Sequence, residues 1–379
     1  MRADKLLREL IALPSVNPAF LPAGDARGGE WRVADYLASL AAKAGLPVEF
    51  EEVFAPTPEA PRRRANLIVR MQPRRGARKR IILAPHLDTV AADDFKPRVE
   101  NGRMFGRGAC DTKGSVAAMF TAFLEVAMAG ERPAETELVF VGLMDEENGQ
   151  EGSRTLARSR LKGDLAIIGE PTELKVVTAH KGDLWLKLVT HGKAAHGARP
   201  ELGDNAVHRM AGVIELIETK YQRSLKKRRH PLLGNATINV GAVRGGTQPN
   251  IVPARCEIDI DRRTIPGEND KAVQREIVNF VRAAGIRVEL LNSKSAPCMP
   301  LETDPQLPLV RELMRFCGQR APAGVDFFSD AAIIAHGGTP SVVFGPGNIA
   351  QAHTANEWIS LRSLEGATAL LTRFLRSLP

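Results

Sequence analysis

The chain places chemically capable side chains where apolar stretches end. The stretch RIILAPHLDTV, residues 80–90, is largely apolar up to Pro85 and then presents His86 and Asp88 two residues apart. The acidic run 145–147 follows the apolar stretch ELVFVGLM in the same way. Both stretches have the composition of buried strands, so both polar groups are expected just past the end of a strand.

Three further residues extend this pattern. Glu170 follows the apolar stretch DLAIIG, Asp111 in GRGACDTKG directly precedes a long helical stretch, and His353 follows the stretch PSVVFGP. In open α/β sheets, ligands bind beyond the carboxyl ends of the strands. We therefore expect these side chains to converge on one pocket.

A cluster of this composition suits a pair of divalent cations. Carboxylates within a few Å of one another raise each other's pKa, and bound cations offset that repulsion. Two histidines with several carboxylates and no thiolate favour zinc, with cobalt or manganese able to substitute. Two-metal hydrolytic sites clamp and activate one water. The predicted cofactors are therefore two Zn²⁺ ions.

Taken one at a time, the same residues have ordinary explanations. An H-x-D pair is often a surface turn, and an acidic triplet is often a solvated strand end. Glu170 also fits a helix cap ahead of Pro171, and His353 fits a buried, hydrogen-bonded imidazole. It is their combination in one chain that points to a metal centre.

Composition narrows the class of protein. The 379 residues are 44% hydrophobic and 25% charged. No apolar run approaches the roughly 20 residues that are needed to cross a bilayer, and the N-terminus lacks the apolar stretch of a signal peptide. A cytoplasmic protein without membrane contact is therefore expected. Four scattered cysteines without a C-x-x-C pair argue against disulfides and a thiolate zinc site. The net charge of +8 is carried by short runs at 62–64, 74–80 and 226–230, with few aromatic residues nearby, so no nucleic-acid partner is expected.

Alternating helices and strands predict an α/β fold. Helices are expected at about 3–12, 30–43 and 112–130, and strands at 66–71, 80–85, 135–144 and 164–170. From about 180 to 293 the order becomes β-α-β-β-α-β, the pattern of a small α+β sandwich, with its first helix over about 205–220. We therefore predict a catalytic domain of residues 1–179 and 295–379, with a mixed sheet flanked by helices, and an inserted, ferredoxin-like α+β domain of residues 180–294.

Six sequence blocks carry a family resemblance: HLDTV, GRGACDTKG, DEENGQEGS, GEPT, HGKAAHGARP and GPGNIAQAHTANEW, in that order. Together they resemble the dinuclear zinc amidohydrolases and peptidases that include acetylornithine deacetylase, succinyl-diaminopimelate desuccinylase, aminoacylase and glutamate carboxypeptidase. The resemblance covers nearly the whole chain. It implies a zinc-peptidase-like catalytic domain, and a homodimer formed through an inserted lid and dimerisation domain.

The resemblance implies five metal ligands, with one carboxylate shared between the two ions. Asp111 would be the shared ligand. His86 and Glu170 would complete the first site, and Glu147 and His353 would complete the second.

Two catalytic roles and one backbone feature follow from the same resemblance. Glu146 would be the general base. Asp88 would orient His86 by accepting the second imidazole N–H, which fixes the tautomer and strengthens the ligand. The peptide bond between Asp111 and Thr112 is expected to be cis.

The inserted domain is similar to the family's lid. His196 in HGKAAHG aligns with the histidine that reaches into the partner subunit's active site to stabilise the oxyanion, and Asn250 and Arg263 fall where family members hold the substrate's carboxylate. His196 also fits a loop hydrogen bond, and Arg263 fits an exposed strand residue. We further expect the lid to close over the catalytic domain.

The tail GPGNIAQAHTANEW is more similar to acetylornithine deacetylases than to desuccinylases. The expected activity is therefore deacetylation of a small N-acyl amino acid such as acetylornithine, in amino-acid biosynthesis. A dipeptidase or carboxypeptidase acting on a peptide substrate, or a succinyl-diaminopimelate desuccinylase, would share the metal residues and differ in the pocket. A basic nucleic-acid-binding protein on a hydrolase scaffold, and a metal-free scaffold that has lost its activity, stay open as alternatives.

Overall fold

The computed structural model describes residues 2–54, 64–92, 95–292 and 298–379. The chain divides into two compact units. Unit 1 comprises Met1–Thr178, Thr303–Ala323 and Ser329–Pro379, and unit 2 comprises Ala179–Glu302 and Gly324–Phe328. The predicted domain boundary at 294–295, and two of the three residues of the basic run 62–64, lie outside the described residues.

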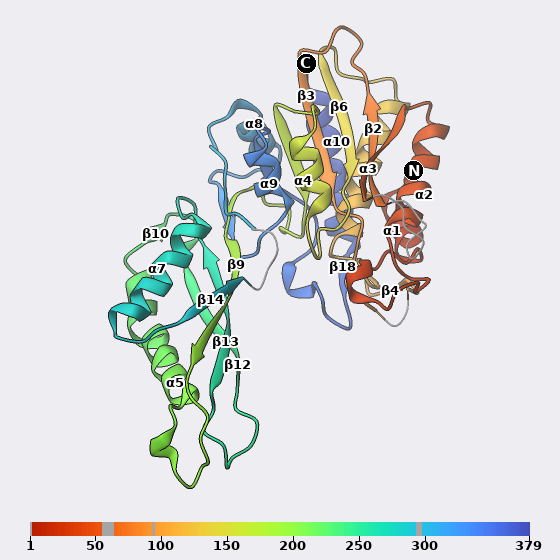
Figure 1. The fold of residues 1–379 in the computed structure, drawn as a ribbon. Coiled ribbons are helices and arrows are strands. Elements are labelled where there is room, and N and C mark those ends of the chain that lie inside the picture. The colour runs from red at the N-terminus through yellow and green to blue at the C-terminus, as the bar shows by residue number, and fades with distance from the viewer. Residues whose placement is uncertain (1, 55–63, 93–94, 293–297) are drawn as a thin grey trace. The chain divides into compact units, whose positions relative to one another are not determined.

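A nine-stranded mixed sheet organises unit 1 (Figure 1). Its strand order is β1-β2-β6-β3-β7-β17-β8-β15, with β16 paired to β8. The central strands β6, β3, β7 and β17 are parallel to their neighbours in this group, whereas β1 and β2 are antiparallel. The strands are β1 (Val48–Phe54), β2 (Arg64–Met71), β3 (Lys79–Pro85), β6 (Thr136–Gly142), β7 (Leu165–Gly169), β8 (Val177–His180), β15 (Leu301–Glu302), β16 (Ala323–Val325) and β17 (Ser341–Val343).

Helices cover both faces of this sheet (Figure 1). Helices α1, α2, α3, α8 and α10 share one hydrophobic core with alternate residues of the strands, and α4 and α9 pack together on the other face. Helix α3 is apolar on nearly all sides because α1, α10 and the sheet surround it. The helices are α1 (Ala3–Ile11), α2 (Trp31–Lys43), α3 (Lys113–Met128), α4 (Glu151–Arg158), α8 (Pro308–Phe316), α9 (Asp330–His336) and α10 (Leu361–Ser377).

Unit 1 also contains a small antiparallel sheet, two strands of which precede α3 in the sequence. It has the order β18-β5-β4, with β4 (Arg98–Glu100), β5 (Arg103–Phe105) and β18 (Trp358–Ser360). Strand β18 pairs with β5, so it joins a segment near the C-terminus to the segment that precedes Asp111.

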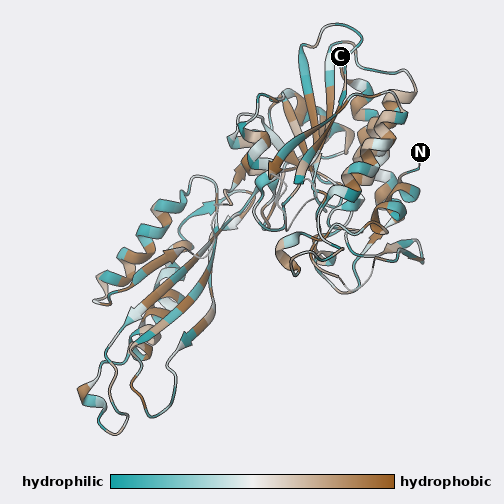
Figure 2. Ribbon diagram, turned by 45° about the vertical axis from the view of Figure 1, so that its right-hand side comes forward, coloured by the Kyte–Doolittle hydropathy of each residue, from teal (hydrophilic) through white to brown (hydrophobic). Residues whose placement is uncertain are grey.

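Unit 2 has a four-stranded antiparallel sheet of order β12-β13-β9-β14. Side chains alternate along these strands, and Figure 2 shows the resulting change between hydrophilic and hydrophobic colours. Helices α5 and α7 supply the rest of its core. The elements are β9 (Gly182–His191), α5 (Ala206–Leu216), α6 (Gln222–Leu225), β10 (Arg229–His230), β11 (Gly234–Asn235), β12 (Thr237–Gly245), β13 (Arg255–Thr264), α7 (Asp270–Ala283) and β14 (Glu289–Asn292).

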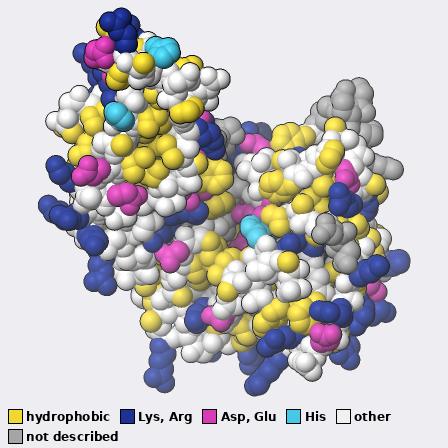
Figure 3. Space-filling model, turned by 90° about the horizontal axis from the view of Figure 1, so that it is seen from below, with side chains coloured by type: hydrophobic (Ala, Val, Ile, Leu, Met, Phe, Trp, Pro, Cys, Tyr) yellow, Lys and Arg dark blue, Asp and Glu magenta, His cyan; other side chains and the backbone are white. Residues whose placement is uncertain are grey.

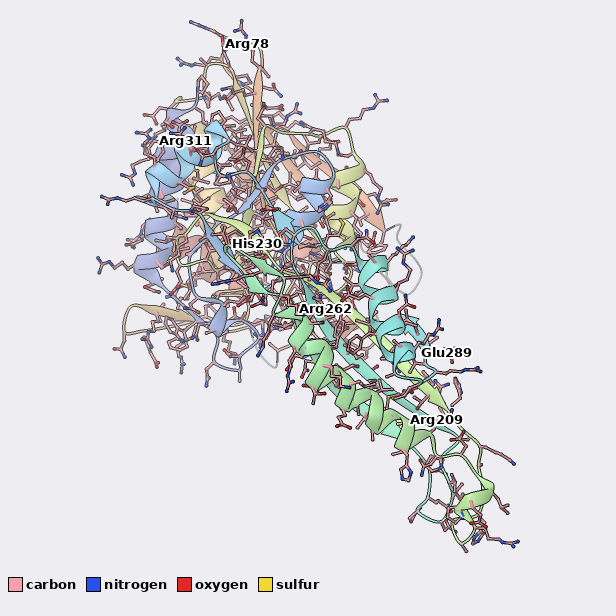
Figure 4. All side chains as sticks on the ribbon, turned by 90° about the vertical axis from the view of Figure 1, so that its left-hand side faces the viewer. Arg78, Arg209, His230, Arg262, Glu289 and Arg311 are labelled. Atoms are coloured by element: carbon pink, nitrogen blue, oxygen red, sulfur yellow. The ribbon has the colours of Figure 1, made fainter. Side chains whose placement is uncertain are left out.

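The four strands of this sheet and the helices α5 and α7 follow the predicted β-α-β-β-α-β order, with α6, β10 and β11 inserted between α5 and β12, and the predicted fold class is confirmed. The predicted helix over 205–220 is helical throughout but not α-helical throughout. The α-helix α5 ends at Leu216, and a π-helical turn, Ile217–Tyr221, follows it directly. Arg262, labelled in Figure 4, is fully buried and forms an ion pair with Glu268 at 2.6 Å, which satisfies a charge inside this small core.

Two expectations from the sequence concern disulfide bonds and membrane-spanning helices. All four cysteines are free thiols. Within the described parts of the chain, no helix is long and apolar enough to cross a membrane.

Candidate active site

Four neighbouring parallel strands of unit 1 bring their carboxyl ends to one edge of the sheet. The run 145–147 follows β6, His86 and Asp88 follow β3, and Glu170 follows β7. His353 lies in the segment after β17, which is parallel to β7. Residues far apart in the sequence therefore meet because parallel strands end at the same edge.

The first group that could hold a metal ion consists of His86, Asp111 and Glu170. The Nε2 atom of His86 lies 3.1 Å from Oδ1 of Asp111 and 3.8 Å from Oε1 of Glu170. All three residues are buried. One imidazole and two carboxylates form a ligand set that suits zinc.

The second group consists of Asp111, Glu147 and His353. The Nε2 atom of His353 lies 3.0 Å from Oε2 of Glu147 and 3.3 Å from Oδ2 of Asp111. Asp111 therefore belongs to both groups, and it presents Oδ1 to one histidine and Oδ2 to the other. The ligand atoms within each group lie within 4.8 Å of one another.

The electrostatics of the site fit bound cations. Burial raises the pKa of Glu146, Glu147 and Glu170, and repulsion between neighbouring carboxylates adds to this rise. Hydrogen bonds to Asp111 and then to Glu147 raise the pKa of His353 to about 10. Oε1 of Glu147 is also buried without a hydrogen-bond partner among the described residues. Divalent cations would neutralise these carboxylates and give that oxygen a partner.

Asp88 connects His86 to the tip of strand β6. Its Oδ1 atom lies 3.3 Å from Nδ1 of His86, and its backbone carbonyl oxygen lies 3.1 Å from the same nitrogen. Its two carboxylate oxygens accept the backbone N–H groups of Glu146 and Glu147 at 3.2 and 3.1 Å. One buried carboxylate thus fixes both the imidazole ring and the acidic run.

Glu146 belongs to neither ligand group found among the described residues, and it is half-buried between Asp145 and Glu147. Burial is the main cause of its raised pKa. A carboxylate with a raised pKa is better matched to take up and return a proton than an ordinary one.

The sequence analysis missed a buried network behind this acidic run. The side-chain amide of Asn17 donates to Oδ2 of Asp88 at 2.8 Å and to Oδ1 of Asp145 at 3.0 Å. Arg64 pairs with Asp145 at 3.1 Å and with Glu30 at 2.9 Å. These partners come from the N-terminal segment and from β2, where no motif marked them.

The peptide bond between Asp111 and Thr112 is cis, which confirms the prediction. The hydroxyl of Thr112 donates to the carbonyl oxygen of Gly169 at 2.9 Å. The loop that carries Asp111 is therefore fastened to the end of β7, beside Glu170.

The remaining three predicted residues belong to unit 2. His196 is exposed, and the backbone N–H of the next residue, Gly197, donates to the carbonyl oxygen of Asn250 at 2.7 Å, so the two loops adjoin. Arg263 is half-buried on β13, and its guanidinium forms an ion pair with Asp261 at 2.9 Å.

The fold and the two ligand groups define a class, the hydrolases of α/β fold with a candidate dinuclear metal centre. The chain belongs to Peptidase family M20/M25/M40, whose model matches residues 82–377. It is 30% identical to the acetylornithine deacetylase of Edwardsiella ictaluri (strain 93-146) over 387 residues, covering 98% of this chain and 96% of that protein. A second relative, the acetylornithine deacetylase of Myxococcus xanthus, is 30% identical and covers 76% of this chain and 75% of that protein.

Solved structures agree on the fold. A tripeptidase from Staphylococcus aureus subsp. aureus Mu50 matches with a TM-score of 0.80 at 21% identity, covering 99% of this chain and 97% of that one. A dinuclear metal-binding peptidase of the M20 family from Bacillus subtilis matches with a TM-score of 0.70 at 15% identity, covering 99% and 96%.

Proposed function

We propose that this hydrolase uses two Zn²⁺ ions to remove the acyl group of a small N-acyl amino acid, with acetylornithine as the leading substrate. The observation that carries the proposal is the pair of ligand groups that share Asp111. The two acetylornithine deacetylases at 30% identity support the choice of substrate.

The residues of unit 1 divide the work of amide hydrolysis. His86, Asp111 and Glu170 would hold one ion, and Asp111 would share the second with Glu147 and His353. Such ions polarise a substrate carbonyl and lower the pKa of a bound water.

Glu146 takes a proton from the attacking water and returns it to the departing amine. Its backbone N–H is held by Asp88, which limits the movement of the base relative to the ligands. Because His86 contacts the same aspartate, Asp88 holds the base Glu146 and the ligand His86 in fixed positions relative to each other.

The inserted domain of about residues 180–294, which falls within unit 2, is proposed to act as lid and dimerisation domain. His196 of one subunit would stabilise the oxyanion in the other subunit's site. Asn250 and Arg263 would hold the substrate's carboxylate, for which Arg263 would exchange its ion pair with Asp261.

A second candidate function is that of a peptidase. The similarity of fold to a tripeptidase, with a TM-score of 0.80, favours it. Both activities use the same metal chemistry and differ in the walls of the pocket. For the nucleic-acid alternative, Figure 3 gives no support on the face it shows, where Lys and Arg side chains are scattered.

The test is amine release from N-acetyl amino acids, N-succinyl-diaminopimelate and dipeptides, with metal-free protein and with added zinc or cobalt. The expected result is metal-dependent turnover, fastest with acetylornithine. Faster turnover of dipeptides would favour the peptidase, and turnover that persists without metal would contradict the mechanism.

A further inference from the structure

A single buried carboxylate gathers the loop that carries Asp111. Glu357 is 2% exposed. It accepts the backbone N–H groups of Gly108, Cys110 and Asp111 at 2.9, 2.8 and 2.9 Å. The guanidinium of Arg107 donates to the same carboxylate at 2.7 Å.

These backbone groups lie ahead of α3, where neither the helix nor a strand supplies their partners. The loop turns through Gly106 and Gly108, whose φ angles are 146° and 82°. The turn directs three N–H groups towards one point, and such a concavity binds an anion. Because hydrogen bonds to an ionised acceptor are stronger than neutral ones, a carboxylate holds this loop more firmly than an amide would.

The backbone of Glu357 is itself fixed to the same segment. Its carbonyl oxygen accepts the N–H of Gly106 at 3.0 Å, and the next residue, Trp358, pairs with Phe105 across β18 and β5. The Asp111 loop therefore has little freedom to move relative to the Glu357 carboxylate.

The segment that leads to Glu357 also carries His353, four residues earlier. This segment touches the Asp111 loop a second time, where the thiol of Cys110 donates to the carbonyl oxygen of Asn348 at 3.3 Å. The loop with the shared ligand and the segment with a histidine ligand are thus joined on both sides of His353.

We propose that Glu357 is a positioning residue for the metal centre, which holds Asp111 in the orientation that serves both ligand groups. The inference rests on the proposed function, because it requires Asp111 to bind both ions. It predicts that loss of the Glu357 charge weakens both metal sites together, although Glu357 is in neither ligand group.

Glu137 offers a matched control within unit 1. It is also 2% exposed, on β6, and its carboxylate accepts from Arg80 at 2.6 Å and from Gln72 at 3.0 Å. Its replacement removes a buried, paired carboxylate without touching the Asp111 loop. A general loss of stability would therefore affect both variants.

The experiment titrates metal-free protein with Co²⁺, followed by calorimetry and by the visible absorption of the bound ions. Glu357→Gln is expected to weaken binding of both Co²⁺ ions by about 10- to 100-fold and to change their spectrum. Glu137→Gln is expected to bind Co²⁺ as the unaltered protein does. Equal affinity and spectrum in Glu357→Gln, or an equal weakening in both variants, would overturn the inference.

Arg107→Met keeps the inference testable if Glu357→Gln does not fold. It removes one bond to the carboxylate and leaves the three backbone bonds, so a smaller weakening of both ions is expected, and none would overturn the inference. If the unaltered protein binds fewer than two Co²⁺ ions, the proposed function itself fails. If it binds two ions and Glu357→Gln is unchanged, only the inference fails.

Discussion

Asp111 is the residue on which the account of the site depends. Its two carboxylate oxygens face two different histidines, at 3.1 and 3.3 Å, and each histidine lies near one further glutamate. A shared carboxylate lets two cations occupy one pocket with few ligands. Burial is the main cause of the raised pKa of Glu147 and Glu170, and the charge of Asp111 adds to it.

Replacement of Glu146 by Gln is expected to lower turnover by roughly 10²- to 10⁴-fold, because it removes the group that transfers the proton. Metal content is expected to stay unchanged, since Glu146 is in neither ligand group of the described site. Amine release and elemental analysis measure the two quantities. Glu151→Gln on α4 is the control and should alter neither. A joint loss of metal and turnover in Glu146→Gln would mean that Glu146 is a ligand.

The ligand candidates could be predicted from the sequence because histidines and carboxylates follow several apolar stretches of the same chain, a combination that points to a metal centre although each residue alone does not. Asn17 and Glu357 could not, since their importance lies in their partners. Asn17 sits in a Pro-rich turn, and its amide happens to meet two buried aspartates 71 and 128 residues away. Glu357 meets its loop across about 250 residues. No local pattern signals such distant pairings.

At the scale of elements, the carboxyl ends of four parallel strands bring the residues of the site together. The strands could be predicted because their apolar runs are short and nearly continuous, as in β3 and β7. The sequence analysis missed the strands β1, β4, β5, β8, β10, β11, β15, β16 and β18 and the helices α4, α6, α9 and α10. Short helices such as α4 and α9 offer only two turns of periodicity, which is too little to separate them from loops. Helix α10 has a clear apolar stripe, so its sequence pattern could have predicted it.

The N-terminal segment is expected to hold the tip of β6 through Asn17. Asn17→Ala removes hydrogen bonds to two buried carboxylates, so a loss of about 3 kcal/mol in unfolding free energy is expected, together with weaker metal binding. Denaturant unfolding and metal titration measure the two effects. Asn235→Ala, which removes bonds to backbone carbonyls in unit 2, should lower stability alone. Unchanged metal affinity in Asn17→Ala would contradict the positioning role.

At the scale of the whole molecule, the two units have separate hydrophobic cores. The sequence predicted both units, because the expected order of helices and strands changes along the chain from the α/β order of unit 1 to the β-α-β-β-α-β order of unit 2. The limits of the units were harder to predict, because unit 2 also includes Gly324–Phe328, which returns to it after α8. A segment of five residues is too short for its composition to show which unit it belongs to.

Metal removal is expected to lower the melting temperature, because ions that bind the folded chain stabilise it. At a metal concentration 100 times the Kd, the gain is about 2.7 kcal/mol for one site. Calorimetry with and without a chelator measures it. Asp111→Asn should lose most of this response, while Asp25→Asn, at a surface ion pair with Arg27, should keep it. An equal response in both variants would place the ions elsewhere.

His196→Ala is expected to lower turnover by roughly 10²- to 10³-fold through loss of an oxyanion donor. Sedimentation velocity should show an unchanged dimer, so the loss would come from chemistry and not from dissociation. His208→Ala, at an exposed position on α5, is the control and should have full activity. Normal turnover in His196→Ala, or a monomeric unaltered protein, would contradict the proposed exchange of histidines between subunits.

The central claim is that two ions share Asp111. Anomalous diffraction at the zinc absorption edge, from crystals grown with Zn²⁺, tests it most directly. The account predicts two peaks, one bounded by His86 and Glu170 and the other by Glu147 and His353, with Asp111 against both. One peak alone, or two peaks that do not share Asp111, would contradict it.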